Sequence, residues 1–415
     1  MITGKIARKL YSIVALALAA AMVLSSCGGG AATATTAAAP ETTGAPATTA
    51  APDTTAAPAT TAAPGTTAAQ ETTAAPDTTA APETTSAAPA TKVIQNVDGS
   101  DIEVPTKVER VAAIFGPSYE KVVLLGAEDK IVCDGDFHID GWPWSNVIYK
   151  RINEVPGIPN AHSNLNIEEM LDYKLDLVFN FPNPGTTEAL RNAGIAVVPM
   201  ASTGKVADIK ATLAVYAEAL GDDAPARAAD YAEYYDDIVA KIAARTADIP
   251  EGEKKTVYAA NQYILKGYGK GAGLTELVDM AGGLSVSRGE EGSSIETTTE
   301  QLIVWDPDYV FVDHAGSSGN DSAEVVIDGF VNDPNYKGIS AVKGGNVLAV
   351  PTGVFFWDSG VQMPLYALWM AKTLYPDRFE DWDMEAELKA FYTRFFDYDL
   401  TDEEAQLILA HQDPK

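Results

Sequence analysis

The chain has few cysteines and few basic residues for its length. Only Cys27 and Cys133 occur among 415 residues. If Cys27 is modified, Cys133 has no partner and the fold does not rest on a disulfide. Lys and Arg number 29 against 58 Asp and Glu, which gives a formal net charge of -29. Such a surface repels nucleic acid and anionic headgroups, so the composition argues against binding to either.

The N-terminus lacks an apolar run long enough to span a membrane, but it has the parts of an export signal. Three basic residues precede an apolar run from Leu10 to Leu24, which ends in Ser-Ser-Cys27. This run falls short of the ~20 residues of a spanning helix and is typical of a secretory signal. Its Leu-Ser-Ser-Cys end resembles a bacterial lipobox, which implies cleavage before Cys27 and a lipid on its sulfur. Ordinary secretion with an incidental Cys27 is the alternative.

Residues 28–91 contain no Lys or Arg and no aromatic, Ile, Leu or Val residue. Proline recurs there every six residues in a Pro-x-Thr-Thr-Ala-Ala unit. Such a segment has nothing to bury, so the sequence predicts a disordered spacer with a bias toward polyproline II. A Thr-rich, Pro-spaced stretch can also be an O-glycosylated stalk.

From Lys92 onward, short apolar runs alternate with helical patterns, which predicts parallel sheets covered on both faces. A hairpin is expected around Asp98-Gly99. The further strands expected are 110–115, 130–133, 176–179, 196–199, 255–260, 309–313 and 346–350. The helices expected are 118–126, 167–173, 186–193, 224–247, 274–281, 299–303, 362–374, 385–396 and 402–410, with another before the joint at Gly221.

The helix expected over 224–247 is about twice the usual length. This helix separates an N-terminal lobe from a C-terminal lobe. The predicted parts of the chain are therefore a signal peptide (1–27), a linker (28–91), an N-terminal lobe (92–205), connecting helices (206–248), a C-terminal lobe (249–375) and a helical extension (376–415).

Four segments resemble the substrate-binding proteins of ABC importers for ferric siderophores, haem and cobalamin. They are Asp101–Val111, Leu165–Leu171 with Asp176-Leu-Val, Leu277–Gly283 and Glu300–Asp308. The resemblance covers about 92–375. One departure is Tyr173-Lys-Leu-Asp, where the family usually has a proline before the aspartate.

The resemblance implies an α/β fold of two Rossmann-like lobes with parallel-rich sheets, joined by a single long α-helix, with the ligand cleft between the lobes. It also implies a monomer without enzymatic activity, lipid-anchored on the outer face of the cytoplasmic membrane. Its partners would be an ABC permease and ATPase. Its cargo would be a metal chelate containing iron or cobalt, and no cofactor other than lipid is expected. The rival reading is a stalked cell-surface adhesin without a transporter.

Ligands of open α/β sheets lie beyond the carboxyl ends of the strands, where this chain has many aromatic residues. Aromatic walls suit a bulky, partly apolar ligand. The alternative is that these side chains only pin loops to the core. The candidate ligand-binding residues are Tyr119, Phe137, Trp142, Trp144, Phe181, Tyr263, Lys266, Tyr268, His314, Phe356 and Trp357.

Glu168 and Glu300 occupy the positions where the family's lobes present carboxylates to arginines of the permease. Glu169 is the alternative in the first lobe. The simpler interpretation is a pair of solvated glutamates favoured by helix dipoles.

Signals for a metal site or for catalysis are weak. The four histidines are not closely spaced, although His138, His162 and His314 could converge with an acid. Tyr263, Tyr268 or His314 could serve as a haem ligand. The glycine-rich segment 267–273 lacks the ending of a P-loop. No spacing of Ser, His, Asp or Cys is diagnostic of an enzyme.

Overall fold

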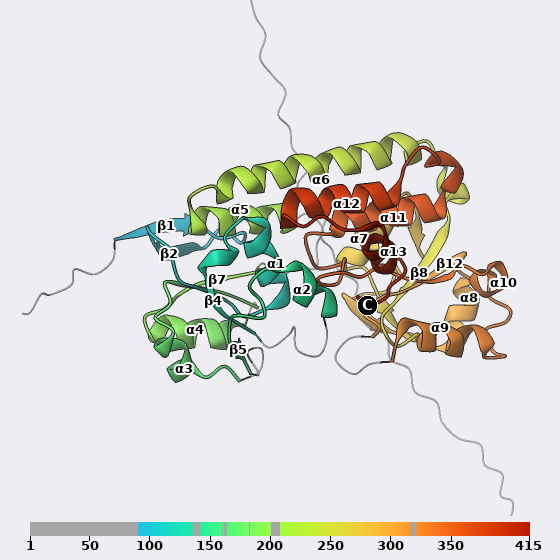
Figure 1. Cartoon of the computed structure of the whole chain (residues 1–415). Coiled ribbons are helices and arrows are strands. Elements are labelled where there is room, and N and C mark those ends of the chain that lie inside the picture. The colour runs from blue at the N-terminus through green and yellow to red at the C-terminus, as the bar shows by residue number, and fades with distance from the viewer. Residues whose placement is uncertain are drawn as a thin grey trace, which may run out of the picture. The chain divides into compact units, whose positions relative to one another are not determined.

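The structure, a computed structural model, describes residues 90–135, 142–159, 161, 164–181, 183–200, 208–316 and 321–415 (Figure 1). The predicted signal peptide, the lipidation site at Cys27 and the linker up to residue 89 lie outside the described residues. Phe137, His138 and His162 also lie outside them. Within the described part of the chain, no helix is both long and apolar enough to cross a membrane.

A two-stranded antiparallel hairpin opens the described chain. β1 (Thr91–Gln95) pairs with β2 (Asp101–Pro105) around the predicted Asp98-Gly99 turn. Gly99 has φ +83°, a conformation that costs a glycine little and an L residue more. Ile94 and Ile102 are opposite each other and buried, so one face of the hairpin packs against the main core.

The first lobe is built on a five-stranded parallel sheet in the order β5-β4-β3-β6-β7. β3 and β6 are buried along their whole length, as strands covered on both faces must be. The strands are β3 (Val111–Ala113), β4 (Ile131–Gly135), β5 (Gly157–Ile158), β6 (Leu177–Asn180) and β7 (Ala196–Pro199). The helices are α1 (Gly116–Leu124), η1 (Glu128–Lys130), α2 (Pro143–Ile148), α3 (Ile167–Asp172) and α4 (Pro184–Asn192). Cys133, on β4, is free and buried, and burial raises the pKa of its thiol to about 12.

Two helices connect this lobe to the next. α5 (Asp208–Leu220) ends before Gly221, whose φ of +72° breaks the helix at the predicted joint. α6 (Ala224–Thr246) follows, one residue shorter than predicted. Its buried face carries Tyr231, Tyr235, Ile238 and Ile242 at spacings of three and four residues, the pattern of an amphipathic helix. α6 packs against α5, α7 and α11, so it contacts helices on both sides of the joint (Figure 1).

The second lobe has a sheet in the order β11-β9-β8-β12-β13, with β10 paired to β8. β8, β10, β12 and β13 run parallel, whereas β9 is antiparallel to both of its neighbours, β8 and β11. The strands are β8 (Thr256–Ala260), β9 (Lys266–Tyr268), β10 (Leu284–Ser285), β11 (Ser294–Glu296), β12 (Tyr309–Val312) and β13 (Val347–Ala349). The helices are η3 (Glu251–Glu253), α7 (Gly273–Met280), α8 (Thr299–Trp305), α9 (Ala323–Asn332) and α10 (Ser340–Gly344).

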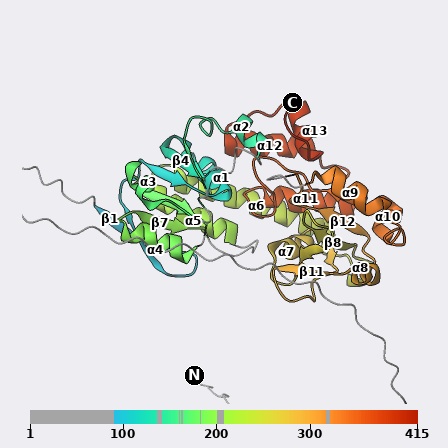
Figure 2. The same ribbon diagram turned by 90° about the horizontal axis from the view of Figure 1, so that it is seen from below.

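The C-terminal part consists of α11 (Met363–Leu374), η4 (Pro376–Arg378), α12 (Met384–Phe396) and α13 (Asp402–Leu409). α12 packs against α1 of the first lobe and α11 of the second. The chain ends beside α13, close to α2 (Figure 2).

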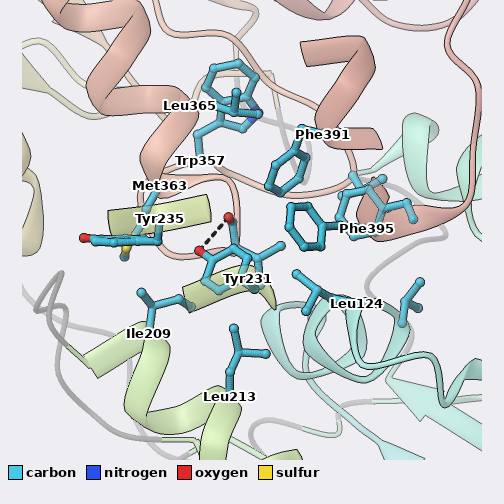
Figure 3. Close-up of a cluster of buried hydrophobic side chains, with 14 of the residues drawn as sticks. Leu124, Ile209, Leu213, Tyr231, Tyr235, Trp357, Met363, Leu365, Phe391 and Phe395 are labelled. Carbon is cyan, nitrogen blue, oxygen red and sulfur yellow. Dashed lines mark hydrogen bonds between the residues drawn. The ribbon is translucent and has the colours of Figure 1, made fainter. Parts of the chain in front are cut away.

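One buried cluster joins these parts (Figure 3). It brings together Leu124 of α1, Tyr231 of α6, Leu365 of α11 and Phe395 of α12. The Tyr231 hydroxyl donates to the Val361 carbonyl at 2.8 Å, which satisfies its polar atom inside the core. Because burying each such side chain contributes about 1.5–3 kcal/mol, the cluster ties the two lobes together firmly.

The predicted fold class is confirmed: two α/β lobes with parallel-rich sheets are linked through one long helix. The sequence analysis missed the helices α2, α9 and α10 and the short strands β5, β9, β10 and β11. It treated Trp142-Pro143-Trp144 as loop, whereas the proline lies in the first turn of α2, where no N–H is needed. α9 contains consecutive β-branched residues that weaken helix propensity, but the Ser322 side chain caps it by accepting from the Val325 amide at 3.3 Å.

Candidate functional site

Aromatic side chains from the two lobes meet beyond the carboxyl ends of the strands. Phe115 lies two residues after β3, and Phe181 directly follows β6 of the first sheet. His314 follows β12, and Phe355 and Phe356 lie after β13 of the second sheet. Parallel strands deliver their following loops to one edge of the sheet, which explains why residues so distant in sequence come together.

These side chains form a continuous series, which we call the aromatic row. The ring centroids of Trp142 lie 4.4 Å from Phe355 and 4.3 Å from Phe356, so the two lobes touch through this indole. Phe356 stacks on the His314 imidazole at 3.7 Å. In order, the row is Phe181, Phe115, Phe355, Trp142, Phe356, His314 and Tyr268, with neighbouring ring centroids no more than 6.3 Å apart.

His314 is held by two carboxylates. Its Nε2 lies 2.9 Å from Asp358 Oδ1, and its backbone N–H donates to Asp313 Oδ1 at 2.8 Å. Its φ of +57° is a left-handed conformation that is unusual for a residue with a side chain. The tight contacts around it therefore hold a strained backbone in place, which is a common feature of functional sites.

The side chains of His314, Asp313 and Asp358 all have perturbed pKa values. Burial opposes the imidazolium, but the carboxylates of Asp358 and Asp313 outweigh it and raise the pKa of His314 to about 9. Burial raises the pKa of Asp313 to about 7, although the His314 charge opposes this. Burial would also raise the pKa of Asp358, but its contact with His314 lowers it. At neutral pH, a His314 imidazolium thus pairs with an Asp358 carboxylate.

Asp313, His314 and Asp358 are also the residues that could hold a metal ion. Each offers one ligand atom, and these atoms lie within 4.8 Å of one another. A metal at Nε2 would have to displace the proton shared with Asp358, because imidazole binds metals only in its neutral form. The raised pKa of His314 makes that displacement costly near pH 7.

A cavity of about 510 Å³ lies beside the aromatic row, and we call it the interlobe cavity. Its size is within the range of small-molecule sites. Trp142 and Phe356 belong both to the row and to the cavity lining. Its lining comes from residues 142–144, 315–316, 322–328, 349–356 and 410–413. Both lobes and the C-terminal end of the chain therefore contribute to it.

The structure brings six of the predicted ligand-binding residues to the row or the cavity. They are Trp142, Trp144, Phe181, Tyr268, His314 and Phe356. The other described candidates lie elsewhere. Tyr263 is 54% exposed, and Lys266 is exposed with its Nζ 3.3 Å from Glu296 Oε1.

Tyr119 and Trp357 lie in the core, which corrects their expected position at the cleft. Tyr119 is fully buried on α1, where its hydroxyl donates to Glu128 Oε1 at 3.3 Å. α1 begins at Gly116, two residues earlier than predicted, and its Tyr119 side chain packs into the main core. Trp357 is fully buried in the cluster of Figure 3.

Phe115 and Phe355 belong to the aromatic row and to loops expected at the cleft, but they were not among the predicted ligand-binding residues. Phe115 is the last residue before α1, and Phe355 directly precedes Phe356, which was among the predicted ligand-binding residues. Its position at the end of the predicted strand 110–115 was the available signal for Phe115. For Phe355 the sequence offered none, because the direction of each side chain in an irregular turn is not periodic.

Glu168 and Glu300 are exposed and occupy equivalent places in the two lobes. Each is the second residue of its helix, α3 or α8. Asn166 and Thr298 cap these helices by accepting from Glu169 N and Gln301 N. Three residues after each glutamate comes an exposed aliphatic side chain, and Glu169 itself is half-buried.

Comparison with known proteins gives consistent results. The sequence profile described as periplasmic binding protein matches residues 111–352. The molybdate-binding protein MolA of Haemophilus influenzae is 26% identical over 262 residues, which is 58% of this chain and 72% of that protein.

Solved structures show the same fold. A periplasmic solute binding protein of Veillonella parvula superposes with a TM-score of 0.65 at 25% identity, covering 77% of this chain and 97% of its own. CeuE of Helicobacter pylori in a Ni-His complex gives a TM-score of 0.62 at 19% identity, covering 77% and 99%.

Proposed function

The chain belongs to the periplasmic binding protein family, the solute-binding components of ABC importers, and from this premise we propose that its cargo is a metal chelate. We infer an iron- or cobalt-containing complex such as a ferric siderophore, a corrinoid or haem, bound between the lobes. The family consists of binding proteins and not of enzymes.

The observation that carries this proposal is the aromatic row beside the interlobe cavity. Rings from both lobes lie against one another there, with Trp142 between Phe355 and Phe356. Flat apolar faces suit the organic shell of a chelate, and a few polar groups would orient it. His314, with Asp358 as its partner, is such a group, because its imidazolium can donate to an oxygen of the cargo.

The names of similar proteins support a metal-containing solute. The Haemophilus relative is named for molybdate, and the Helicobacter structure is a Ni-His complex. These ligands differ in size and charge, so they support the class of cargo without specifying its chelator.

We also propose Glu168 and Glu300 as the contacts to the permease. Their matched positions on α3 and α8 would present one carboxylate per lobe to basic residues of the membrane subunits. Ion pairs of this kind set register and encounter rate more than affinity.

The remaining part of the proposal concerns location. A lipid at Cys27 would hold the protein on the outer face of the cytoplasmic membrane. The Thr/Ala/Pro linker would then let the folded part reach solute and permease.

The proposal is tested by mass spectrometry of ligand that co-purifies with the full chain from its native host. Titration with ferric siderophores, a corrinoid and haem, followed by tryptophan fluorescence, is the second measurement. A bound chelate should change the emission of Trp142 and Trp144, so Trp142→Phe should reduce the response while Trp382→Phe, outside the cavity lining, keeps it in full. No co-purified metal complex and no response to any chelate would overturn the proposal.

A further inference from the structure

The wall of the interlobe cavity includes the C-terminal tail, residues 410–413, which lies beyond the segment matched by the family profile. Trp144 Nε1 of the first lobe donates to the Gln412 carbonyl at 2.9 Å. His411 Nδ1 and Nε2 lie 2.5 Å and 3.1 Å from the carbonyl oxygens of Val350 and Ala315 of the second lobe. The tail is thus fixed to both lobes, and its side chains are a built part of the cavity.

The cavity combines an aromatic floor with an acidic rim. Trp142 and Trp144 are buried, whereas the carboxylates of Glu324, Asp328 and Asp413 belong to exposed residues of the lining. Burial of the indoles gives the floor a fixed shape, and the three exposed carboxyl groups lie at the edge of the cavity.

No Lys or Arg side chain balances this rim among the described lining residues. The sequence explains why: Lys and Arg are absent from 131–149, 289–336, 344–371 and 395–414, the four stretches that supply the lining. Lys266, the basic residue among the predicted ligand-binding residues, is paired with Glu296 and does not line the cavity. A negative cavity edge attracts cations and repels anions over several ångströms.

We propose that the interlobe cavity selects a metal complex of net positive charge, with a flat apolar face against Trp142 and Phe356 and its positive edge toward Glu324, Asp328 and Asp413. The inference rests on the proposed function and narrows it to one charge class. Oxyanions and polyanionic chelates are disfavoured, because each would meet three carboxylates and no Lys or Arg side chain among the described lining residues, while the His314 imidazolium is already paired with Asp358. The charge class proposed for this cargo therefore differs from that of molybdate, the anion for which the Haemophilus relative is named.

The test uses two complexes of similar size and shape but opposite charge. Iron(II) tris-bipyridine is a cation, iron(III) tris-catecholate is an anion, and both present aromatic faces around an octahedral metal. Calorimetry with the full chain at low salt should show binding of the cation at least about tenfold tighter, because three rim charges act on it. High salt should reduce the difference, and molybdate should not compete.

A triple variant tests whether the rim is responsible. Glu324→Gln with Asp328→Asn and Asp413→Asn should remove most of the preference for the cation. The matched control removes three exposed carboxylates that do not line the cavity, through Asp172→Asn, Glu253→Gln and Asp377→Asn. This control carries the same net charge and should keep the preference.

Three outcomes contradict the inference, and they can be told apart. Tighter binding of the anionic complex, or of molybdate, overturns the charge selection while leaving a metal-binding cargo function intact. If the triple variant still prefers the cationic complex to the same extent, the three rim carboxylates are not responsible for the charge selection. Binding of neither complex overturns the inference together with the proposed function.

Discussion

Replacing His314 should flatten the dependence of stability on alkaline pH. His314 has an ordinary pKa of 6.5 when unfolded and about 9 when folded. A raised pKa means that the folded state holds the proton more tightly, so stability is fully present below pH 6.5 and is lost as pH rises through 9. The side chain is 28% exposed, which leaves the interaction with Asp358 largely unscreened.

The size of this effect follows from the two pKa values. Between pH 7 and pH 9 the difference corresponds to about 2 kcal/mol of unfolding free energy. Asp313, whose pKa is raised to about 7, changes its own contribution mostly below this window. For a folded part of the chain that spans residues 90–415, 2 kcal/mol amounts to a fall of about 3 °C in Tm.

The assay is thermal unfolding at half-unit steps from pH 7 to pH 9. His314→Asn is the best perturbation, because asparagine tolerates the left-handed backbone found at this position. Its Tm should fall less with pH than that of the wild-type chain, by about 3 °C over the window. Asp358→Asn should have the same flattening effect, since it removes the largest interaction that raises the pKa of His314.

His411→Asn is the matched control for this experiment. His411 also has a left-handed backbone, with φ +56°, but its ring nitrogens face carbonyl oxygens instead of carboxylates. The difference in pH slope between the two asparagine variants therefore measures the carboxylate interaction. An unchanged slope in His314→Asn would refute the reasoning.

Two further predictions concern docking and the anchor. Reversing both charges, through Glu168→Lys and Glu300→Lys, should abolish stimulation of the importer ATPase in proteoliposomes with no change in ligand affinity. The control reverses the exposed Asp129 and Glu253 and should leave the stimulation intact. Stimulation that persists in the Glu168→Lys, Glu300→Lys variant would refute the docking role. Cys27→Ser should move the protein from the membrane fraction to the soluble fraction and remove the lipid mass from its N-terminal peptide; continued membrane association would argue against the thioether anchor.

Much of the fold could be predicted because its signals are local. The strand at Ala196–Pro199 has the predicted bounds, and the predicted long helix is α6 to within one residue. Apolar runs of four residues and a 3.6-residue stripe depend only on neighbours in sequence. The antiparallel β9 and β11 were missed because they are three residues long and contain Gly or Ser.

The candidate site was predictable at the level of loops but not of individual side chains. The loops after β3, β6, β12 and β13 were expected at the cleft, since strand ends in a parallel sheet share one edge. Phe355 and Trp357 differ by two positions in one turn, yet the first joins the aromatic row and the second the core. The contribution of residues 410–413 to the cavity depends on contacts across more than two hundred residues, such as Trp144 with Gln412, which no local pattern reveals.

A buried carboxylate at the junction of the lobes indicates how far they can move. Glu120 of α1 is completely buried, and it accepts from Val361 N at 2.8 Å and from Gln362 Nε2 at 3.0 Å, both beyond β13. Burial raises the pKa of Glu120, and Lys121 beside it opposes the rise. Gln362 in turn accepts from the Tyr392 hydroxyl at 2.7 Å on α12.

Separating α1 from residues 361–362 would break these hydrogen bonds and open the cluster of Figure 3, at a cost of several kcal/mol. We therefore expect a wide swing of the lobes to be disfavoured and the cargo to enter through rearrangement of the aromatic row. If so, the spacing between Glu168 and Glu300 stays nearly constant with and without cargo. Paired spin labels at these two positions should then report the same distance in both states, and a shift of many ångströms would show that the junction opens.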